Sequence, residues 1–366
     1  MSNKISIEIQ SLMKKRILIM DGAMGTMIQQ ENLKEDDFIG KNSTIQINQS
    51  VTKKINEAIN KGAELKGNNE LLSLTQPELI KKIHKDYLLA GSDIIETNTF
   101  GATSIAQSDY HLDSLVKELN TSSAKIANEA CKEFREKGEK KFVAGAIGPT
   151  PKTASISPDV NDPGARNITF DELVFSYKEQ AIALIDGGID LFLIETVFDT
   201  LNAKAAIFAL NDVFFEKKQS FPIMISGTVT DASGRILSGQ TVEAFWNSVR
   251  HANPISIGLN CALGAALMRP YVDELSKISS TAVCVYPDAG LPNPMAPTGF
   301  DETPEITSKL LGEFAKEGWV NIVGGCCGTT PEHIKLMKKV TQRLKPRKKL
   351  QKDKYMRLSG LEAFNY

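Results

Sequence analysis

Hydrophobic residues gather in short continuous runs along this chain and do not alternate strictly with polar residues. Eight runs have the length of a β-strand: residues 17–22, 93–100, 141–149, 190–197, 221–229, 255–262, 282–290 and 320–328. Continuous apolar character is typical of parallel strands that are buried on both faces. We therefore predict eight parallel strands.

Longer segments with a helical repeat separate these runs. In the segment 170–188, Leu173, Tyr177, Ala181 and Leu184 recur at helical spacing before a Gly-Gly pair. A repeat of this kind predicts an amphipathic helix with one face against the sheet, and glycine is the usual residue just past a helix end.

Two more helices carry clear end signals. The segment 75–91 has Thr75 as the expected N-cap and closes at Gly91, and the segment 330–344 has Thr330 as its cap before a proline. The second of these helices follows the last predicted strand directly.

Alternating strands and helices predict right-handed crossovers and a parallel sheet. Eight units favour a single (β/α)₈ TIM barrel over residues 1–344, with a long first βα loop at 26–74 in which 42–62 suggests a short amphipathic helix. An open doubly wound sheet is the alternative, but the first strand lacks the usual G-x-G-x-x-G. Residues 345–366 are expected to form a basic, solvated linker (345–354) and a short tail.

Composition narrows the class of protein. The net charge is −1 with mixed signs along most of the chain, which argues against nucleic-acid binding. No apolar stretch exceeds strand length, so no membrane span is expected, and the first 16 residues lack the apolar core of a signal peptide. We expect a cytoplasmic protein whose five cysteines are reduced thiols.

The polar residues that could carry chemistry fall where the predicted strands end. In a barrel the active site lies at the C-terminal ends of the strands. The side chains expected at that rim are Asp21, Glu96, Glu195, Cys261, Asp288, Cys326 and Cys327.

Three thiols at one rim match a zinc site with an open fourth position: Cys261, Cys326 and Cys327. The glycines that flank the Cys-Cys pair allow the backbone to leave strand geometry, so that two adjacent side chains can reach one ion. The alternatives for this pair are two buried small hydrophobes or a vicinal disulfide. Cys131 and Cys284 are expected in the core.

Three thiolates weaken a metal as a Lewis acid but suit the binding of a fourth thiol, which stays electron-rich. The four histidines (His84, His111, His251, His333) lie in predicted helices, which argues against a histidine-based zinc hydrolase. The donor set therefore favours transfer of a group to a thiol.

Two carboxylates at the same rim, Asp21 and Glu195, could bind an ammonium group, and amides in the Gly-rich turn after Asp21 could bind a carboxylate. Helix capping or hydrogen bonding within the rim are the alternatives for both acids. Ammonium, carboxylate and thiol together describe a thiol amino acid.

Several motifs resemble the N-terminal homocysteine-binding module of cobalamin-dependent methionine synthase, a branch of the homocysteine S-methyltransferase family. The resemblance runs from about Arg16 to the C-terminus and is most specific at "TDASGRILSGQT". Other matching stretches are "DGAMGTMIQ", "IIETNTF", "IETVFDTLNAKAA", "GLNCALGA" and "NIVGGCCGTTPEHI".

The resemblance implies a catalytic zinc ion held by the three rim cysteines, with the sulfur of homocysteine in the fourth position. It implies that the substrate ammonium meets Asp21 and Glu195 and that its carboxylate meets amides near Gly22, Ala23 and Met24. The activated thiolate would take a methyl group from methylcobalamin, giving methionine.

Three features depart from the family pattern. Residues 41–66 do not follow it, and Asp288 stands where the family commonly has an asparagine that can reach the zinc when homocysteine is absent. The tail resembles the lead-in to a folate-binding domain, so the folate- and cobalamin-binding modules are expected on a separate chain. The alternatives are a self-sufficient enzyme that uses S-methylmethionine or betaine, and a non-catalytic protein that binds zinc or homocysteine.

Overall fold

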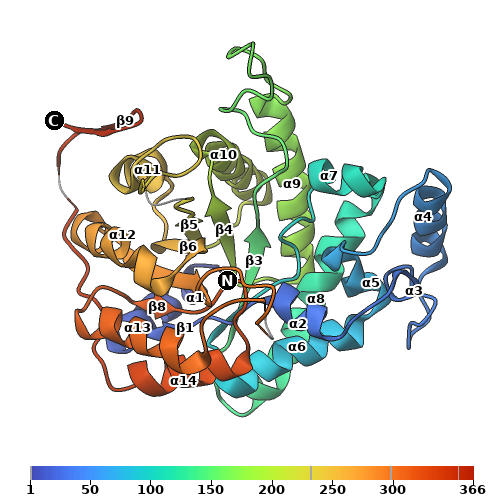
Figure 1. Cartoon of the computed structure of the whole chain (residues 1–366), viewed down its shortest axis with the longest axis horizontal. Coiled ribbons are helices and arrows are strands. Elements are labelled where there is room, and N and C mark those ends of the chain that lie inside the picture. The colour runs from blue at the N-terminus through green and yellow to red at the C-terminus, as the bar shows by residue number, and fades with distance from the viewer. Residues whose placement is uncertain (1, 231–232, 297–298, 353) are drawn as a thin grey trace.

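A nearly closed barrel of eight parallel strands forms the centre of the protein, which we describe from a computed structural model (Figure 1). The structure describes residues 2–230, 233–296, 299–352 and 354–366, so Asp231 and Ala232 of the "TDASGRILSGQT" motif lie outside the described residues. The sheet order is β1-β8-β7-β6-β5-β4-β3-β2. The strands are β1 (Leu18–Ile19), β2 (Ile94–Glu96), β3 (Phe142–Ile147), β4 (Leu191–Val197), β5 (Ile223–Gly227), β6 (Ser256–Gly264), β7 (Ala282–Asp288) and β8 (Ile322–Val323).

A single parallel bridge between Met20 and Ile94 joins the two edges of the sheet, and Asp93 N–H donates to Ile19 O across the same seam. The first strand therefore has neighbours on both sides, as a barrel requires. The prediction of a (β/α)₈ barrel is confirmed, and the open-sheet alternative is wrong.

Helices surround the barrel on its outer face (Figure 1). The crossover helices are α6 (Pro77–Ala90), α8 (Val116–Glu136), α9 (Phe170–Gly187), α10 (Thr200–Lys217), α11 (Val242–Val249), α12 (Ala265–Ile278), α13 (Pro304–Lys316) and α14 (Pro331–Thr341). Short α7 (Ser104–Gln107), η2 (Ser108–Tyr110), η3 (Asp113–Leu115) and η4 (Arg250–Ala252) complete these connections.

The helix predictions hold except at one cap. Gly188 ends α9 with φ of 92°, and Thr330 caps α14 as expected. Thr75, however, is the last residue of α5 (Leu72–Thr75), and its hydroxyl donates to Leu71 O. Gln76 takes the N-cap position of α6 because the preceding turn is itself helical.

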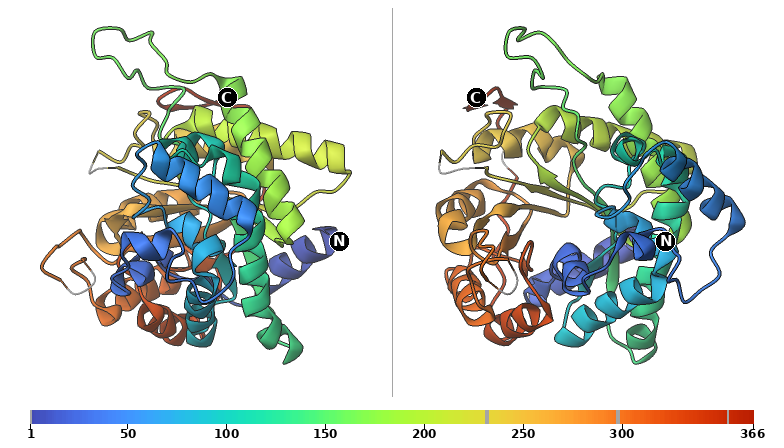
Figure 2. Two further views of the ribbon diagram at one scale, coloured as in Figure 1. Left: turned by 90° about the vertical axis from the view of Figure 1, so that its right-hand side faces the viewer. Right: turned by 45° about the vertical axis from the view of Figure 1, so that its right-hand side comes forward.

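An N-terminal helix, α1 (Ser2–Lys15), closes one end of the barrel (Figure 2). Its Ile9 and Met13 are fully buried against inward-facing strand residues such as Leu18, Met20 and Phe142. Burying two large apolar side chains stabilises the fold by roughly 3–6 kcal/mol. The other end of the barrel, where the strand C-termini lie, remains for the site.

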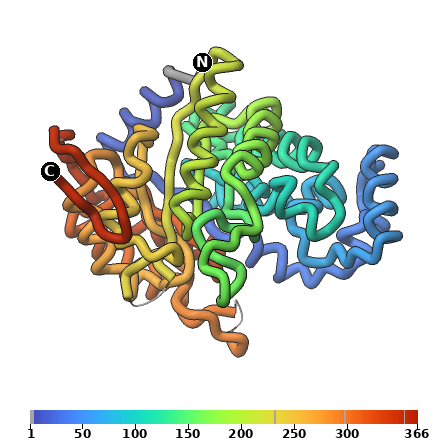
Figure 3. The backbone as a smooth tube through the Cα atoms, turned by 90° about the horizontal axis from the view of Figure 1, so that it is seen from above, coloured from blue at the N-terminus to red at the C-terminus, as the bar shows by residue number. Residues whose placement is uncertain are grey.

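The long first connection folds into short helices on one side of the barrel, far from the C-terminal hairpin (Figure 3). The expected amphipathic helix is present as α4 (Gln49–Asn60), which buries Val51, Ile55 and Ala58. The other elements of this connection are α2 (Met24–Gln30), α3 (Glu35–Phe38) and η1 (Asn69–Leu71).

Most described residues of the run 345–354 are exposed, as expected, but Arg347 is an exception. Arg347 is buried, and its guanidinium donates to the carbonyl oxygens of Ser276, Ser279 and Thr281. The chain then forms a hairpin of β9 (Arg357–Ser359) and β10 (Ala363–Asn365). Within the described residues, every helix is too short or too polar to cross a membrane.

Candidate active site

The end of β6 leaves regular strand geometry at the first candidate ligand. Cys261 and Ala262 have φ of 60° and 61°, and the pairing of β6 with β7 shifts register between Asn260 and Gly264. Left-handed backbone costs free energy for residues other than glycine and is found mainly at functional sites. The distortion places the Cys261 side chain at the barrel mouth.

A buried amide stabilises this distortion. Thr196, at the end of β4, also has a positive φ of 53°, and its N–H donates to Asn260 Oδ1 at 3.1 Å. Asn260 Nδ2 in turn donates to Thr196 Oγ1 at 2.8 Å. Asn260 therefore ties the end of β4, which carries Glu195, to the end of β6, which carries Cys261.

Glycines allow the loop after β8 to pack tightly. A Cβ at Gly324 would lie 2.7 Å from Met20 Cβ, and one at Gly325 would lie 2.4 Å from Thr329 Oγ1. Gly328 has φ of 79°, a conformation that favours glycine. The sequence argument that these glycines let the backbone turn at the Cys-Cys pair agrees with this geometry.

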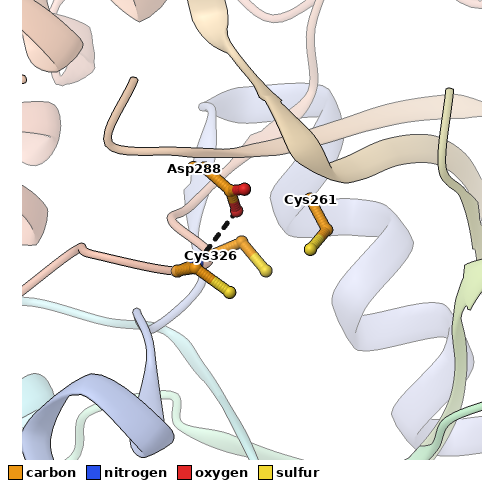
Figure 4. Close-up of side chains that lie close together, drawn as sticks. Cys261, Asp288 and Cys326 are labelled. Carbon is orange, nitrogen blue, oxygen red and sulfur yellow. Dashed lines mark hydrogen bonds between the residues drawn. The ribbon is translucent and has the colours of Figure 1, made fainter. Parts of the chain in front are cut away.

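Four potential metal ligands converge at the mouth: Cys261, Asp288, Cys326 and Cys327. Their ligand atoms all lie within 4.8 Å of one another. Cys327 N–H donates to Asp288 Oδ1 at 3.0 Å, and the carboxylate and the thiols face a common point (Figure 4). Residues from β6, β7 and the loop after β8 thus meet, although Cys261 and Cys326 are 65 positions apart in the sequence.

The thiols perturb one another strongly. Hydrogen bonds from Cys261 and Cys326 lower the pKa of Cys327 to about 5, while hydrogen bonds to Cys261 and Cys327 raise the pKa of Cys326 well above its usual value. Burial, followed by the charge of Cys261, raises the pKa of Asp288 to about 8. The cluster therefore favours one thiolate, at Cys327, and disfavours the loss of further protons from Cys326 and Asp288 unless a cation is bound.

This donor set fits a zinc ion. Three soft sulfur atoms and one carboxylate oxygen are the ligand types and the number of a tetrahedral zinc site, and a single exchangeable oxygen leaves a position for a substrate.

Three carboxyl groups lie beside the cluster, at the ends of β1, β2 and β4: Asp21, Glu96 and Glu195. The exposed fractions of Asp21 and Glu195 are 4% and 5%. Burial, followed by the charges of Glu96 and Asp21, raises the pKa of Glu195 well above its usual value. The sequence placed Glu96 at the rim but assigned it no role.

The loop after β1 is hydrogen-bonded to the loop after β8. Ala23 N–H donates to Thr329 Oγ1 at 3.2 Å, and the Tyr87 hydroxyl donates to Ala23 O at 3.0 Å. Gly22 packs tightly against Thr329 and Tyr87, since a Cβ at this position would lie 2.7 Å from Thr329 Oγ1 and 2.9 Å from Tyr87 Cε1. The Ala23 amide is thus already engaged, and Met24 begins α2 at the pocket wall.

One cavity of about 390 Å³ connects these groups. It opens at the C-terminal ends of the strands and is lined by Asp21, Glu96, Glu195, Cys261, Cys326 and Cys327, together with Met24 and residues of the first connection such as Asn69 and Glu70. The carboxyl groups that the sequence suggests as ligands of an ammonium group therefore share one pocket with the cysteines that it suggests as metal ligands.

The cysteines and histidines that the sequence places elsewhere do lie elsewhere. Cys131 and Cys284 are fully buried in the core. His84 is also fully buried, which lowers its pKa to about 4, and His333 bonds with Thr330 at the start of α14.

A protein-family comparison identifies the class of enzyme. Residues 18–341 match the family model described as homocysteine S-methyltransferase. The chain belongs to the homocysteine S-methyltransferase family.

Solved structures with this fold agree with that membership. The metallated form of the homocysteine methyltransferase MmuM from Escherichia coli is 21% identical, with a TM-score of 0.63, and the match covers 89% of this chain and 96% of that chain. The apo form of the same protein is 20% identical, with a TM-score of 0.59, over 90% and 97% of the two chains. At this identity the structural likeness shows the shared barrel.

For this member of the homocysteine S-methyltransferase family, sequence reasoning assigned no role to two residues at the site. Glu96 lines the pocket beside Glu195, and Asn260 links the distorted ends of β4 and β6. Asn260 directly precedes Cys261, so the sequence places it at the same strand end. Its partner Thr196 is 64 positions away, and only the fold brings the two residues together.

Proposed function

We propose that this chain binds zinc through Cys261, Cys326 and Cys327, activates homocysteine as a thiolate and transfers a methyl group to it from methylcobalamin supplied by another domain or polypeptide, forming methionine. The observation that carries the proposal is one pocket lined both by the three clustered cysteines and by three carboxyl groups, with Asp288 beside the sulfur atoms. The resemblance to the methionine synthase module favours methylcobalamin as the donor.

In this proposal, different residues of the chain bind the metal and the substrate. A bound zinc ion would ionise the substrate thiol near neutral pH while leaving its sulfur nucleophilic. Asp21 and Glu195 would accept hydrogen bonds from the substrate ammonium. The backbone amides on either side of Ala23, those of Gly22 and Met24, would hold its carboxylate, because the Ala23 amide donates to Thr329.

Asp288 is suited to exchange with the substrate. Its carboxylate lies within 4.8 Å of the three sulfur atoms, so it would hold the metal together with the three cysteines when homocysteine is absent. The substrate sulfur would then attack the methyl carbon in line with the bond to its leaving group, and that bond's electron pair would stay with the donor.

The test is methyl transfer by zinc-loaded protein supplied with homocysteine and free methylcobalamin, in parallel with S-methylmethionine and with betaine. We expect methionine formation with methylcobalamin, and its loss in Cys327→Ala but not in the matched core variant Cys131→Ala. Turnover with one of the small donors alone would reassign the protein as a self-sufficient methyltransferase. Homocysteine binding without turnover of any donor would favour a binding protein.

A further inference from the structure

The three carboxyl groups of the pocket form a connected cluster, which is unusual for a barrel interior. Glu96 N–H donates to Asp21 Oδ2 at 2.9 Å, and the side chains of Glu96 and Glu195 are hydrogen-bonded to each other. Within the described residues, none of the three forms an ion pair with a lysine or arginine. Buried like charges without a counter-ion destabilise a fold, so a cluster of this kind requires a proton or a cationic ligand.

The Glu96 carboxyl group has no evident role in stabilising the fold. The link from β2 to Asp21 uses the Glu96 backbone N–H, and among the described residues the hydrogen-bond partner of the Glu96 carboxyl group is another acid, Glu195. Burial raises the pKa of Glu96 to about 7, which is the cost of keeping this group in the pocket. A residue that only supported the sheet would be more stable as an uncharged side chain.

Independent evidence for a ligand comes from Tyr286 on β7. Its exposed fraction is 1%, it lines the same pocket, and its hydroxyl has no hydrogen-bond partner of normal geometry among the described residues. The Ser226 hydroxyl near it already donates to Asn260 Oδ1 at 2.7 Å. A buried hydroxyl without a partner costs about 1–3 kcal/mol, which a bound ligand can offset.

We propose that Glu96 is a third carboxyl ligand of the substrate's α-ammonium group and that Tyr286 completes this subsite, so that the pocket selects a primary amine. Three carboxyl groups match the three N–H donors of a primary ammonium, whereas an N-alkylated amine would leave one carboxyl group without a donor. This inference rests on the proposed function, because it assumes that an amino acid thiol occupies the pocket.

The experiment compares the dissociation constants of two thiols that differ only in the amino group, homocysteine and 4-mercaptobutyrate, on the zinc-loaded protein. In the wild type we expect homocysteine to bind more than about a hundredfold more tightly, because three carboxyl groups contact its ammonium group. Glu96→Gln is expected to reduce this preference by about ten- to a hundredfold, leaving the affinity for 4-mercaptobutyrate and the zinc content unchanged. Glu70→Gln, the same change at another carboxyl group in the pocket wall, is expected to keep the wild-type preference.

Stability separates a ligand-binding role from a structural one. Glu96→Gln is expected to keep or raise the melting temperature, because it removes a buried charge that has no counter-ion. Tyr286→Phe is expected to reduce the preference for homocysteine by roughly two- to tenfold, without a loss of stability.

Two results would overturn the inference. In the first, Glu96→Gln prefers homocysteine over 4-mercaptobutyrate as strongly as the wild type does. In the second, Glu96→Gln loses affinity equally for both thiols and has a lower melting temperature. If Tyr286→Phe keeps the full preference, the tyrosine is removed from the subsite. If the wild type itself binds both thiols equally, the proposed ammonium contact with Asp21 and Glu195 fails, and the inference about Glu96 fails with it.

Discussion

At the scale of single residues, the site depends on groups that disfavour one another until a ligand arrives. Cys327 has its pKa lowered to about 5 by its neighbouring thiols, whereas Asp288 has its pKa raised to about 8 by burial and by Cys261. Such opposed shifts are typical of functional sites, because a core under no functional constraint would not hold these groups together. Their roles can be separated one side chain at a time.

The first prediction concerns the three thiols. Cys261→Ala, Cys326→Ala and Cys327→Ala should each lose the zinc that the wild type is expected to carry, about one ion per chain. Metal analysis of purified protein checks this, with Cys131→Ala as the control that removes a thiol from the core. A variant that retains full zinc would remove its cysteine from the ligand set.

The second prediction concerns Glu195. Glu195→Gln should weaken homocysteine binding by roughly 1.5–3 kcal/mol, the size of a hydrogen bond to a charged group, and leave zinc content unchanged. Calorimetric titration with homocysteine and with 4-mercaptobutyrate, which lacks only the amino group, measures the difference. Equal losses for both thiols would show that Glu195 only supports the rim.

At the scale of secondary-structure elements, the ends of the strands matter more than their middles. β4 and β6 both shift register near their C-terminal ends, and both contain residues with positive φ there. Asn260 spans the two distortions and also lies 4.0 Å from Cys326 Sγ. Residues that orient metal ligands in this way tune the affinity of a site without touching the ion.

The third prediction follows for Asn260. Asn260→Ala should lower the free energy of unfolding by about 1–3 kcal/mol, through unsatisfied buried partners, and weaken zinc binding by about 10- to 100-fold. Asn120→Ala is a matched control: Asn120 is equally buried and bonds to Ala102 O, Val116 O and Gln180. Asn120→Ala should lose comparable stability and keep its zinc affinity. An equal loss of zinc affinity in Asn120→Ala would contradict a specific role of Asn260 in orienting the metal ligands.

At the scale of the whole molecule, the barrel separates stability from chemistry. One end is closed by α1 and the other carries the pocket, so the packing of α1 should affect folding but not the site (Figure 2). This division is general for barrels, in which the loops at the C-terminal ends of the strands carry function.

The fourth prediction tests this separation. Ile9→Ala should cost about 2–5 kcal/mol of unfolding free energy, because it empties a fully buried site beneath the barrel. Ile7→Ala, in the same helix but with 62% of Ile7 exposed, should change stability by less than about 0.5 kcal/mol. Chemical denaturation measures both, and zinc content should be unchanged in both. Loss of zinc in folded Ile9→Ala would show that the two ends are coupled.

The sequence by itself determined the features that depend on local pattern. Continuous apolar runs predicted all eight strands, and end signals such as Gly188 and Thr330 located helices, because burial on both faces and backbone freedom act over a few neighbouring residues. The Cys-Cys pair, Cys261 and the acids at strand ends were recognised because a parallel barrel puts all strand C-termini at one rim.

Only the tertiary structure decided which of these groups meet. Glu96 contacts Glu195, Asn260 bridges to Thr196, and Arg347 enters the core to bind three carbonyl groups, and none of these pairs has a signature in local sequence. Thr75 was misplaced as a cap for a different, local reason: it ends the preceding helix α5, so Gln76 takes the N-cap position of α6. Local pattern fixes which element a residue belongs to, whereas partners distant in the chain are set by how the closed barrel brings the strand ends together.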